Sequence, residues 1–195
     1  MNVGVLALQG DVPEHLRVLR SLVPDTIPVR SPADLESVGA LFLPGGESTT
    51  IARLIEQMGL WSRLAERIRR GLPVLATCAG LILLAKELAP SAAGRDPPTF
   101  GVLDVRVRRN DYGAQRESFE APVRVEGVAG KPFPGVFIRS PRILAVGPDA
   151  APIAWRGKEV VGVRAGAVWG LTFHPELSGD LRVHRAFLSS TGVLL

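Results

Sequence analysis

The sequence predicts an α/β protein built on a mixed, mostly parallel sheet flanked by helices. Two observations predict this class. Short apolar runs at residues 3–8, 40–43 and 73–77 alternate with helical patterns, as parallel strands joined by crossover helices do. After residue 100, short apolar or alternating runs are separated by turn residues, which favours antiparallel strands. Because 195 residues suffice for one core and no second core is evident, we expect one domain over residues 1–195.

The helices of the N-terminal half are predicted by apolar residues at helical spacing. The first helix places four of them on one face, namely Val12, Leu16, Leu19 and Leu22. Residues 60–70 repeat this spacing with Leu60, Leu64 and Ile68. The same helix is then expected to face water with Arg63, Arg67 and Arg70.

The C-terminal half is predicted to consist mostly of strands and to close with a helix. The expected strands span residues 102–107, 119–125, 136–138, 143–146, 159–163 and 168–173. Residues 180–188 carry apolar side chains at helical spacing, and Asp180 is placed to cap the start. We expect this last helix to pack back on the sheet.

Composition and charge exclude several classes of function. The formal net charge of +4 is spread among acids with no run of five like charges, so we do not expect nucleic-acid binding. The single cysteine rules out an intrachain disulfide. Residues 1–8 lack the basic start of a secretory signal, and no apolar stretch is long enough to cross a bilayer. We therefore expect a cytoplasmic protein without a membrane partner.

Residues 73–84 are typical of a nucleophile elbow, in which a buried strand turns sharply into an apolar helix. Cys78 stands at the turn, and the small residues Ala76 and Gly80 flank it where the strand and the helix leave little space. The start of the helix favours a thiolate at this position. A buried, unreactive cysteine is the alternative, and this segment alone does not decide between the two.

A base and a carboxylate, His174 and Glu176, follow the last strongly apolar strand. Parallel-sheet enzymes gather their sites at the carboxyl ends of strands, so His174 can meet Cys78 there. We expect His174 to act as base and acid, and Glu176 to orient it. The alternative is a strand-ending turn with a solvated carboxylate. His15 and His184 lie in helical patterns and are interpreted as surface, core-edge or partner-facing residues, and no metal site is expected.

Residues 43–50 form a third candidate element, a glycine-containing turn that follows a strand and opens a helix. The turn lacks the lysine and the spacing of a phosphate-binding Walker loop. We interpret it as part of an oxyanion hole, in which the N–H groups of Gly46 and Ala79 stabilise the oxyanion formed from a carboxamide. A helix start capped by serine or threonine is the alternative, and both can hold together.

Together these motifs resemble the class I, triad-type glutamine amidotransferases and, within that class, the glutaminase subunits of pyridoxal 5'-phosphate synthases. The resemblance covers essentially the whole chain and is carried by residues 8–10, 44–50, 77–81, 109–110, 118–120, 137–139 and 172–176. It implies a flavodoxin-like fold and hydrolysis of L-glutamine to L-glutamate and ammonia through a thioester on Cys78. An arginine and a glutamate suit the charged ends of glutamine. The resemblance implies glutamine contacts from Gly46, Glu47, Ser48, Arg109, Ile138 and Arg139.

The resemblance further implies a separate synthase subunit as partner in a large hetero-oligomer, whose docking switches the glutaminase on. That subunit receives the ammonia and makes pyridoxal 5'-phosphate from a pentose phosphate and a triose phosphate. Because pyridoxal 5'-phosphate is the product of the complex, this chain is expected to need no cofactor. Two residues depart from the family pattern, Ala76 in place of glycine and Ala114 within residues 111–115. The alternatives are an amidotransferase that serves another synthase and a non-catalytic scaffold relative, against which the intact triad argues.

Overall fold

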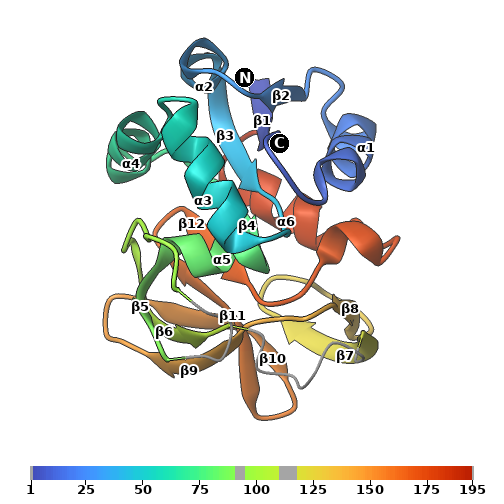
Figure 1. Cartoon of the computed structure of the whole chain (residues 1–195). Helices are drawn as coiled ribbons and strands as arrows, with labels where there is room; N and C mark the ends of the chain where they lie inside the picture. Colours follow the sequence, from blue (N-terminus) through green and yellow to red (C-terminus); the bar gives the residue numbers. More distant parts are fainter. Residues whose placement is uncertain (1, 91–94, 110–117, 195) are drawn as a thin grey trace.

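Two sheets and their flanking helices make up the structure, a computed structural model that describes residues 2–90, 95–109 and 118–194. Within these residues the larger sheet has nine strands in the order β2-β1-β3-β4-β12-β11-β10-β7-β8, and the smaller has three in the order β5-β6-β9. Figure 1 shows the N-terminal strands and helices above, and most of the antiparallel strands below. The predicted mixed α/β class is confirmed.

The N-terminal half supplies the parallel part of the large sheet. Its strands are β1 (Asn2–Leu6), β2 (Ile27–Val29), β3 (Val38–Leu43) and β4 (Val74–Thr77), and the late strand β12 (Val168–Leu171) lies parallel to β4. The order β2-β1-β3-β4-β12 is that of a flavodoxin-like sheet. The helices of this half are α1 (Val12–Leu22), α2 (Pro32–Ser37), α3 (Ser48–Gln57), α4 (Trp61–Arg69) and α5 (Ala79–Leu84).

The C-terminal half extends the large sheet with antiparallel strands. These are β11 (Glu159–Ala165), β10 (Ala151–Arg156), β7 (Phe119–Val125) and β8 (Phe133–Phe137). In the small sheet, β6 (Leu103–Arg108) pairs with β5 (Ala85–Leu88) in parallel and with β9 (Arg142–Val146) in antiparallel. The 3-10 helix η1 (Pro175–Leu177) and α6 (Arg182–Ser190) follow. The N-cap residue of α6 is Leu181 and not the predicted Asp180, whose carboxylate accepts the N–H of Arg182, the first residue of the helix, at 3.0 Å.

Alternate residues of the central strands divide the core between the two faces of the large sheet. In β3, Leu41 and Leu43 belong to the cluster covered by α2 to α5 and the small sheet. Ala40 and Phe42 belong to the cluster covered by α1 and α6. Because both faces are covered, the strand ends are the places left for a site.

Several features differ from the expectations. The sequence pattern does not predict β2, β5, β10 or α2. β2 and β10 contain proline, β5 follows α5 without a turn, and α2 has only six residues. The expectation that Arg67 faces water is wrong, because its guanidinium donates hydrogen bonds to the carbonyls of Leu35 and Val38. The surface or core-edge placement of His15 and His184 is also wrong, because both side chains are wholly buried.

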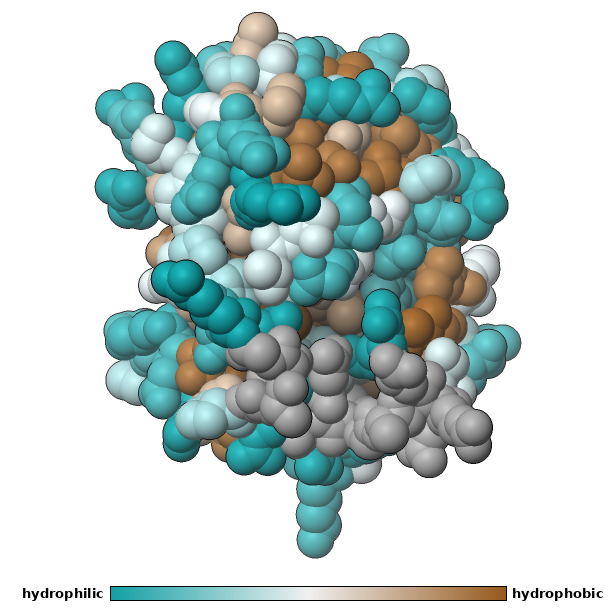
Figure 2. Space-filling model, in the orientation of Figure 1, coloured by the Kyte–Doolittle hydropathy of each residue, from teal (hydrophilic) through white to brown (hydrophobic). Residues whose placement is uncertain are grey.

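The surface is mostly hydrophilic on the face shown in Figure 2, where the largest hydrophobic area lies in the upper half. Among the large hydrophobic side chains of the described ranges, the exposed ones are Met58 and Leu144. No helix within those ranges has the length and apolar character that a membrane span requires.

Candidate active site

Cys78 stands at a strained turn between β4 and α5. Its backbone has φ 48° and ψ −103°, a conformation that residues with side chains rarely adopt. The Cys78 N–H donates a hydrogen bond to the Leu171 carbonyl of β12 at 2.8 Å, which fixes the turn. Gly80 packs tightly, since an added Cβ would lie 2.5 Å from the Leu43 carbonyl oxygen. The strand, sharp turn and helix expected around Cys78 are thus present, and the fully buried Ala76 fits within them.

His174 and Glu176 follow β12 and meet this turn at the same end of the sheet. Leu171 pairs with Thr77, which brings together the residues that follow β12 and β4. The His174 N–H donates to the Val136 carbonyl of β8 at 2.8 Å. The His174 ring donates from Nδ1 to Glu176 Oε1 at 2.7 Å, and Glu176 is 1% exposed. A histidine and a carboxylate that bonds its ring therefore stand in the protein interior, next to the turn that carries Cys78.

The charge state of this pair follows from its buried contacts. Burial opposes ionisation of Glu176, but the neighbouring rings of His15 and His174 outweigh it and hold the pKa of this carboxyl below its ordinary value. Burial would also lower the pKa of His174, yet this pKa lies well above its ordinary value because the ring interacts with Asp11, Cys78 and Glu176. His174 therefore favours the imidazolium form.

The two ring nitrogens of His174 have different neighbours. Nδ1 faces a second carboxylate, since Asp11 Oδ2 lies 3.2 Å away. Nε2 is buried and completes no hydrogen bond among the described residues. The Cys78 Sγ instead approaches the Ile138 carbonyl at 3.9 Å, a weak contact. Such catalytic contacts are often long in a free enzyme and shorten when substrate binds.

A cavity of about 150 Å³ lies at Cys78. Its lining contains every residue expected to bind glutamine, and it consists of Asp11, Gly46, Glu47, Ser48, Cys78, Ile82, Arg109, Ile138, Arg139 and His174. Two predicted site residues, Glu176 and Ala79, do not line the cavity. Glu176 bonds Nδ1 of the His174 ring, and Ala79 is the first residue of α5. Asp11 and Ile82 are the lining residues that sequence reasoning missed, because Asp11 belongs to no recognised motif and Ile82 was expected only as an apolar residue of the helix after Cys78.

The glycine turn between β3 and α3 lies against the loop that follows β1. The Glu47 N–H donates to the side-chain oxygen of Gln9 at 2.9 Å. Gly46 has φ 153°, and an added Cβ would lie 2.5 Å from that Gln9 oxygen, so glycine is required here. In the described part of the chain, neither the Gly46 N–H nor the Ala79 N–H bonds a protein acceptor, which leaves both available to an oxyanion.

Glu47 and Arg109, expected to hold the two charged ends of glutamine, lie against each other. The Glu47 carboxylate caps α3 by accepting the N–H groups of Thr49 and Thr50 at 3.1 and 2.7 Å, so glutamate, and neither serine nor threonine, is the cap. The Arg109 guanidinium lies 3.5 Å from Glu47 Oε1 and 3.4 Å from Asp96 Oδ1. Arg109 is only 6% exposed, so these contacts fix its direction.

Arg139 is an exposed residue at the cavity with φ 42°. Among the non-glycine residues of the described ranges, positive φ occurs at Cys78 and at Arg139, and both line the cavity. Backbone strain of this kind concentrates at functional sites. Ala114, the second departure from the family pattern, lies outside the described residues.

Asp11, His174 and Glu176 also form a group whose ligand-capable atoms lie within 4.8 Å of one another. The shared Nδ1–H of His174 accounts for this proximity, since both carboxylates approach it. The absence of a resident metal stays a prediction.

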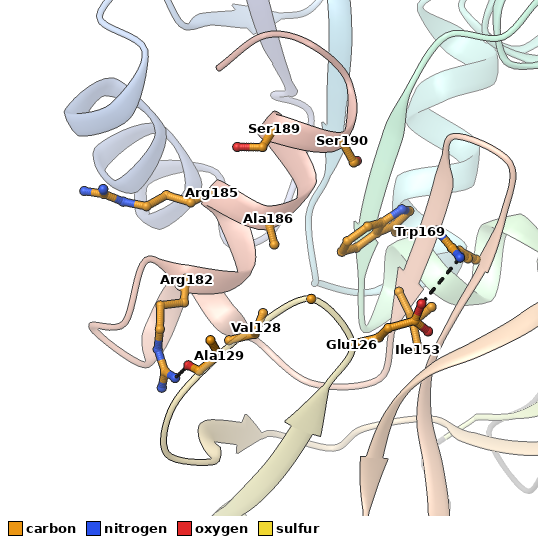
Figure 3. A pocket seen from close by; sticks show the side chains of 12 residues that line it. Glu126, Val128, Ala129, Ile153, Trp169, Arg182, Arg185, Ala186, Ser189 and Ser190 are labelled. Atoms are coloured by element: carbon orange, nitrogen blue, oxygen red, sulfur yellow. Dashed lines mark hydrogen bonds and ion pairs between the residues drawn. The ribbon is translucent and has the colours of Figure 1, made fainter. Parts of the chain in front are cut away.

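A larger cavity of about 560 Å³ shares no lining residue with this site. Figure 3 shows it between α6, which contributes Arg182, Arg185 and Ala186, and the turn after β7. Trp169 forms part of its wall. Its lining contains no cysteine or histidine.

Known proteins resemble this chain along nearly its whole length. The model of the SNO glutamine amidotransferase family matches residues 5–192. The pyridoxal 5'-phosphate synthase subunit PdxT of Streptomyces coelicolor is 50% identical over 185 residues, 95% of this chain and 91% of that protein. The subunit of the same name from Thermotoga maritima is 47% identical over 188 residues, 96% of this chain and 98% of that protein.

Solved structures agree with these sequence comparisons. A crystal structure of a glutamine amidotransferase has a TM-score of 0.89 and 43% identity, and the match covers 97% of this chain and 98% of that one. A glutamine amidotransferase from Thermotoga maritima, with 17% identity and a TM-score of 0.58 over 98% of this chain and 82% of that one, shares the fold alone. This chain belongs to the SNO glutamine amidotransferase family.

Proposed function

We propose that this chain is the glutaminase subunit of a pyridoxal 5'-phosphate synthase. The observation that carries the proposal is that Cys78, at a strained turn, shares one cavity with His174, whose ring is held by the buried Glu176. Relatives similar over nearly the whole chain bear the name of a pyridoxal 5'-phosphate synthase subunit, which supports this assignment over a synthase for another product. The complete triad argues against a non-catalytic scaffold.

In the first half-reaction the Cys78 thiolate attacks the carboxamide carbon of glutamine and forms a C–S bond. The carbonyl oxygen becomes an oxyanion, which the N–H groups of Gly46 and Ala79 stabilise. The imidazolium of His174 gives its Nε2 proton to the leaving nitrogen. The C–N bond then breaks, ammonia departs, and a thioester remains on Cys78.

In the second half-reaction water attacks the thioester carbon. His174, now neutral, takes a proton from that water at Nε2. The C–S bond breaks, glutamate leaves, and the thiolate of Cys78 again faces an imidazolium. Glu176 holds the Nδ1–H through both halves, so the ring keeps the orientation that the two proton transfers need.

The charged ends of glutamine determine which cavity residues bind it. We assign the α-carboxylate to Arg109, because a guanidinium binds a carboxylate through two parallel hydrogen bonds. We assign the α-ammonium to Glu47, which the N–H groups at the start of α3 already fix in place. Gly46, Ser48, Ile138 and Arg139 complete the glutamine-binding wall.

The released ammonia passes to a synthase subunit with which this chain forms a hetero-oligomer. Pyridoxal 5'-phosphate is the product of that partner, so this chain binds no cofactor for its own reaction. A free thiol stays reduced most readily in the cytoplasm, which favours that compartment. Several arginines are paired with acids, which supports the absence of a nucleic-acid partner.

Glutamine hydrolysis by purified protein, measured as ammonia release with and without the synthase subunit, tests the function. We expect activity that depends on Cys78 and that rises when the synthase subunit is added. Cys78→Ala is the informative variant, because it removes the nucleophile and changes little volume. Undiminished ammonia release by Cys78→Ala in the complex would refute the assignment of the nucleophile.

A further inference from the structure

His15 is a buried titratable residue that the proposed reaction does not use, yet it contacts both sides of the site. It lies on α1 and is wholly buried. Its Nε2 lies 3.2 Å from the Oγ1 of Thr77, the residue before Cys78, and 3.5 Å from Glu176 Oε1. One ring nitrogen thus reaches both the strand end that carries the nucleophile and the carboxylate that orients the base.

The surroundings of the His15 ring decide which nitrogen carries its proton. Nδ1 is buried and has no hydrogen-bond partner in the described part of the chain. A proton on Nδ1 would be an unpaired buried donor, and the bare Nε2 would turn its lone pair toward the Glu176 carboxylate. The opposite tautomer avoids both costs. His15 therefore carries its proton on Nε2 and donates it toward Glu176 and Thr77.

His15 remains neutral in this position. Burial is the largest influence and lowers the pKa of His15 despite the nearby Glu176 carboxylate. The titratable groups that act on or face the ring are Glu176, His174, Asp11, Glu14 and His184, whose ring centroid lies 6.1 Å away. Because His15 is uncharged, its contact with Glu176 is an N–H dipole on a carboxylate, and it leaves the net charge of the triad unchanged.

The Glu176 carboxylate needs a second donor. Oε1 accepts the His174 Nδ1–H, while Oε2 is buried and has no hydrogen-bond partner among the described residues. A buried carboxylate with one full hydrogen bond is poorly stabilised in its charged form. The Nε2–H of His15 approaches the same oxygen, Oε1, at 3.5 Å, so it adds a second N–H dipole beside the carboxylate while Oε2 keeps no partner among the described residues.

We propose that His15 is a positioning residue of the triad, whose Nε2–H keeps the Glu176 carboxylate ionised and aligned with His174. It also ties that carboxylate to Thr77, at the end of the strand that carries Cys78. His15 lies outside the glutamine cavity, so it acts through Glu176 and touches no substrate. This inference rests on the proposed glutaminase function.

Three matched variants test the inference in the complex with the synthase subunit. His15→Phe fills the space of the ring without a donor, His15→Gln places an amide N–H near the position of Nε2, and His184→Phe alters a neighbouring buried histidine that bonds no triad residue. We expect His15→Phe to lower kcat about 10-fold, through the loss of one N–H dipole beside the charged Glu176 carboxylate, with KM unchanged. The acid limb of its pH profile should move to higher pH, because Glu176 becomes easier to protonate.

We expect His15→Gln to recover most of the wild-type kcat and to return the acid limb of the pH profile toward its wild-type position. We expect His184→Phe to retain wild-type kinetics. Wild-type kcat in His15→Phe, or equal loss in the Phe and Gln variants, would overturn the inference, because packing alone does not depend on the donor. If His15→Phe does not fold, nitrogen NMR of the unaltered protein decides. The Nε2-protonated tautomer is expected near neutral pH, and an Nδ1-protonated ring would overturn the inference.

Failure of the inference is distinguishable from failure of the function. An inactive Cys78→Ala together with a fully active His15→Phe would leave the glutaminase function standing and remove only the role of His15. A fully active Cys78→Ala would remove the function itself.

Discussion

Gly45→Ala tests whether the fold holds the His174 ring where the proposed chemistry needs it. An alanine Cβ at this position would lie 2.7 Å from Asp11 Oδ2, 3.0 Å from His174 Nδ1 and closer still to His174 Cε1, whereas ordinary contact begins at 3.4 Å. Gly45 has no positive φ, so the substitution acts through contact and not through backbone strain. The ring must withdraw by roughly 1 Å, a displacement that costs about 100-fold in rate for a catalytic group. We therefore expect kcat to fall about 100-fold.

The assay is steady-state ammonia release in the presence of the synthase subunit, paired with denaturant unfolding of each variant. Gly71→Ala is the matched control, because Gly71 has φ 94° and an added Cβ meets nothing within 4 Å. It should lose about 1 kcal/mol of unfolding free energy through backbone strain and keep its kcat. A folded Gly45→Ala protein with undiminished kcat would refute the reasoning, since the ring would then not depend on the space beside Gly45.

Three further predictions concern the charges of the site and the core. Asp11→Asn removes one of the two carboxylates at His174 Nδ1, so the pKa of His174 should fall. The alkaline limb of the pH profile of kcat/KM should then shift to lower pH by about one unit. An unshifted limb would exclude a role for Asp11. Burial lowers the pKa of His184 to about 3 from 6.5, so its contribution to stability is present above pH 6.5 and is lost as the pH falls. Unfolding of His184→Phe between about pH 6 and pH 4 should therefore show a slope shallower by up to about 1.4 kcal/mol per pH unit, and an unchanged slope would contradict that pKa. Arg109→Lys cannot form the bidentate hydrogen bond to a carboxylate, so the KM for glutamine should rise about tenfold in steady-state kinetics. An unchanged KM would show that Arg109 does not bind the α-carboxylate.

The sequence predicts the elements that local rules determine. The elbow at Cys78 is recognisable because strand, small residues and helix are contiguous in the chain. His174 could be placed near it because β4 and β12 end at the same edge of a parallel sheet. The flavodoxin-like strand order follows from the resemblance to a family, and periodicity alone does not give it.

The helical pattern in the sequence does not reveal whether a polar side chain is buried or exposed. The expected apolar face of α1 is present, but it is rotated, so that His15 is fully buried while Leu16 is half-buried. A histidine at that position has the same spacing whether it meets water or a buried carboxylate. Arg67 shows the same limit, because the carbonyls that it bonds belong to α2 and β3, far away in the sequence.

Contacts between loops were equally hidden. Asp11 reaches His174 from the loop after β1, and no motif joins the two residues. Glu47 fits the role of a ligand for an ammonium, yet the structure also makes it the cap of α3 and a neighbour of Arg109. Such double roles depend on distances across the fold, which spacing along the chain does not contain.

Covalent trapping of the nucleophile tests the central claim most directly. The complex would be treated with a glutamine analogue that carries an electrophilic carbon in place of the carboxamide, and the labelled peptide would be located by mass spectrometry. We predict one adduct per chain on Cys78, formed much more slowly in His174→Ala and competed away by L-glutamine. Labelling at another residue, or labelling of Cys78 at the same rate without His174, would contradict a Cys78–His174 glutaminase.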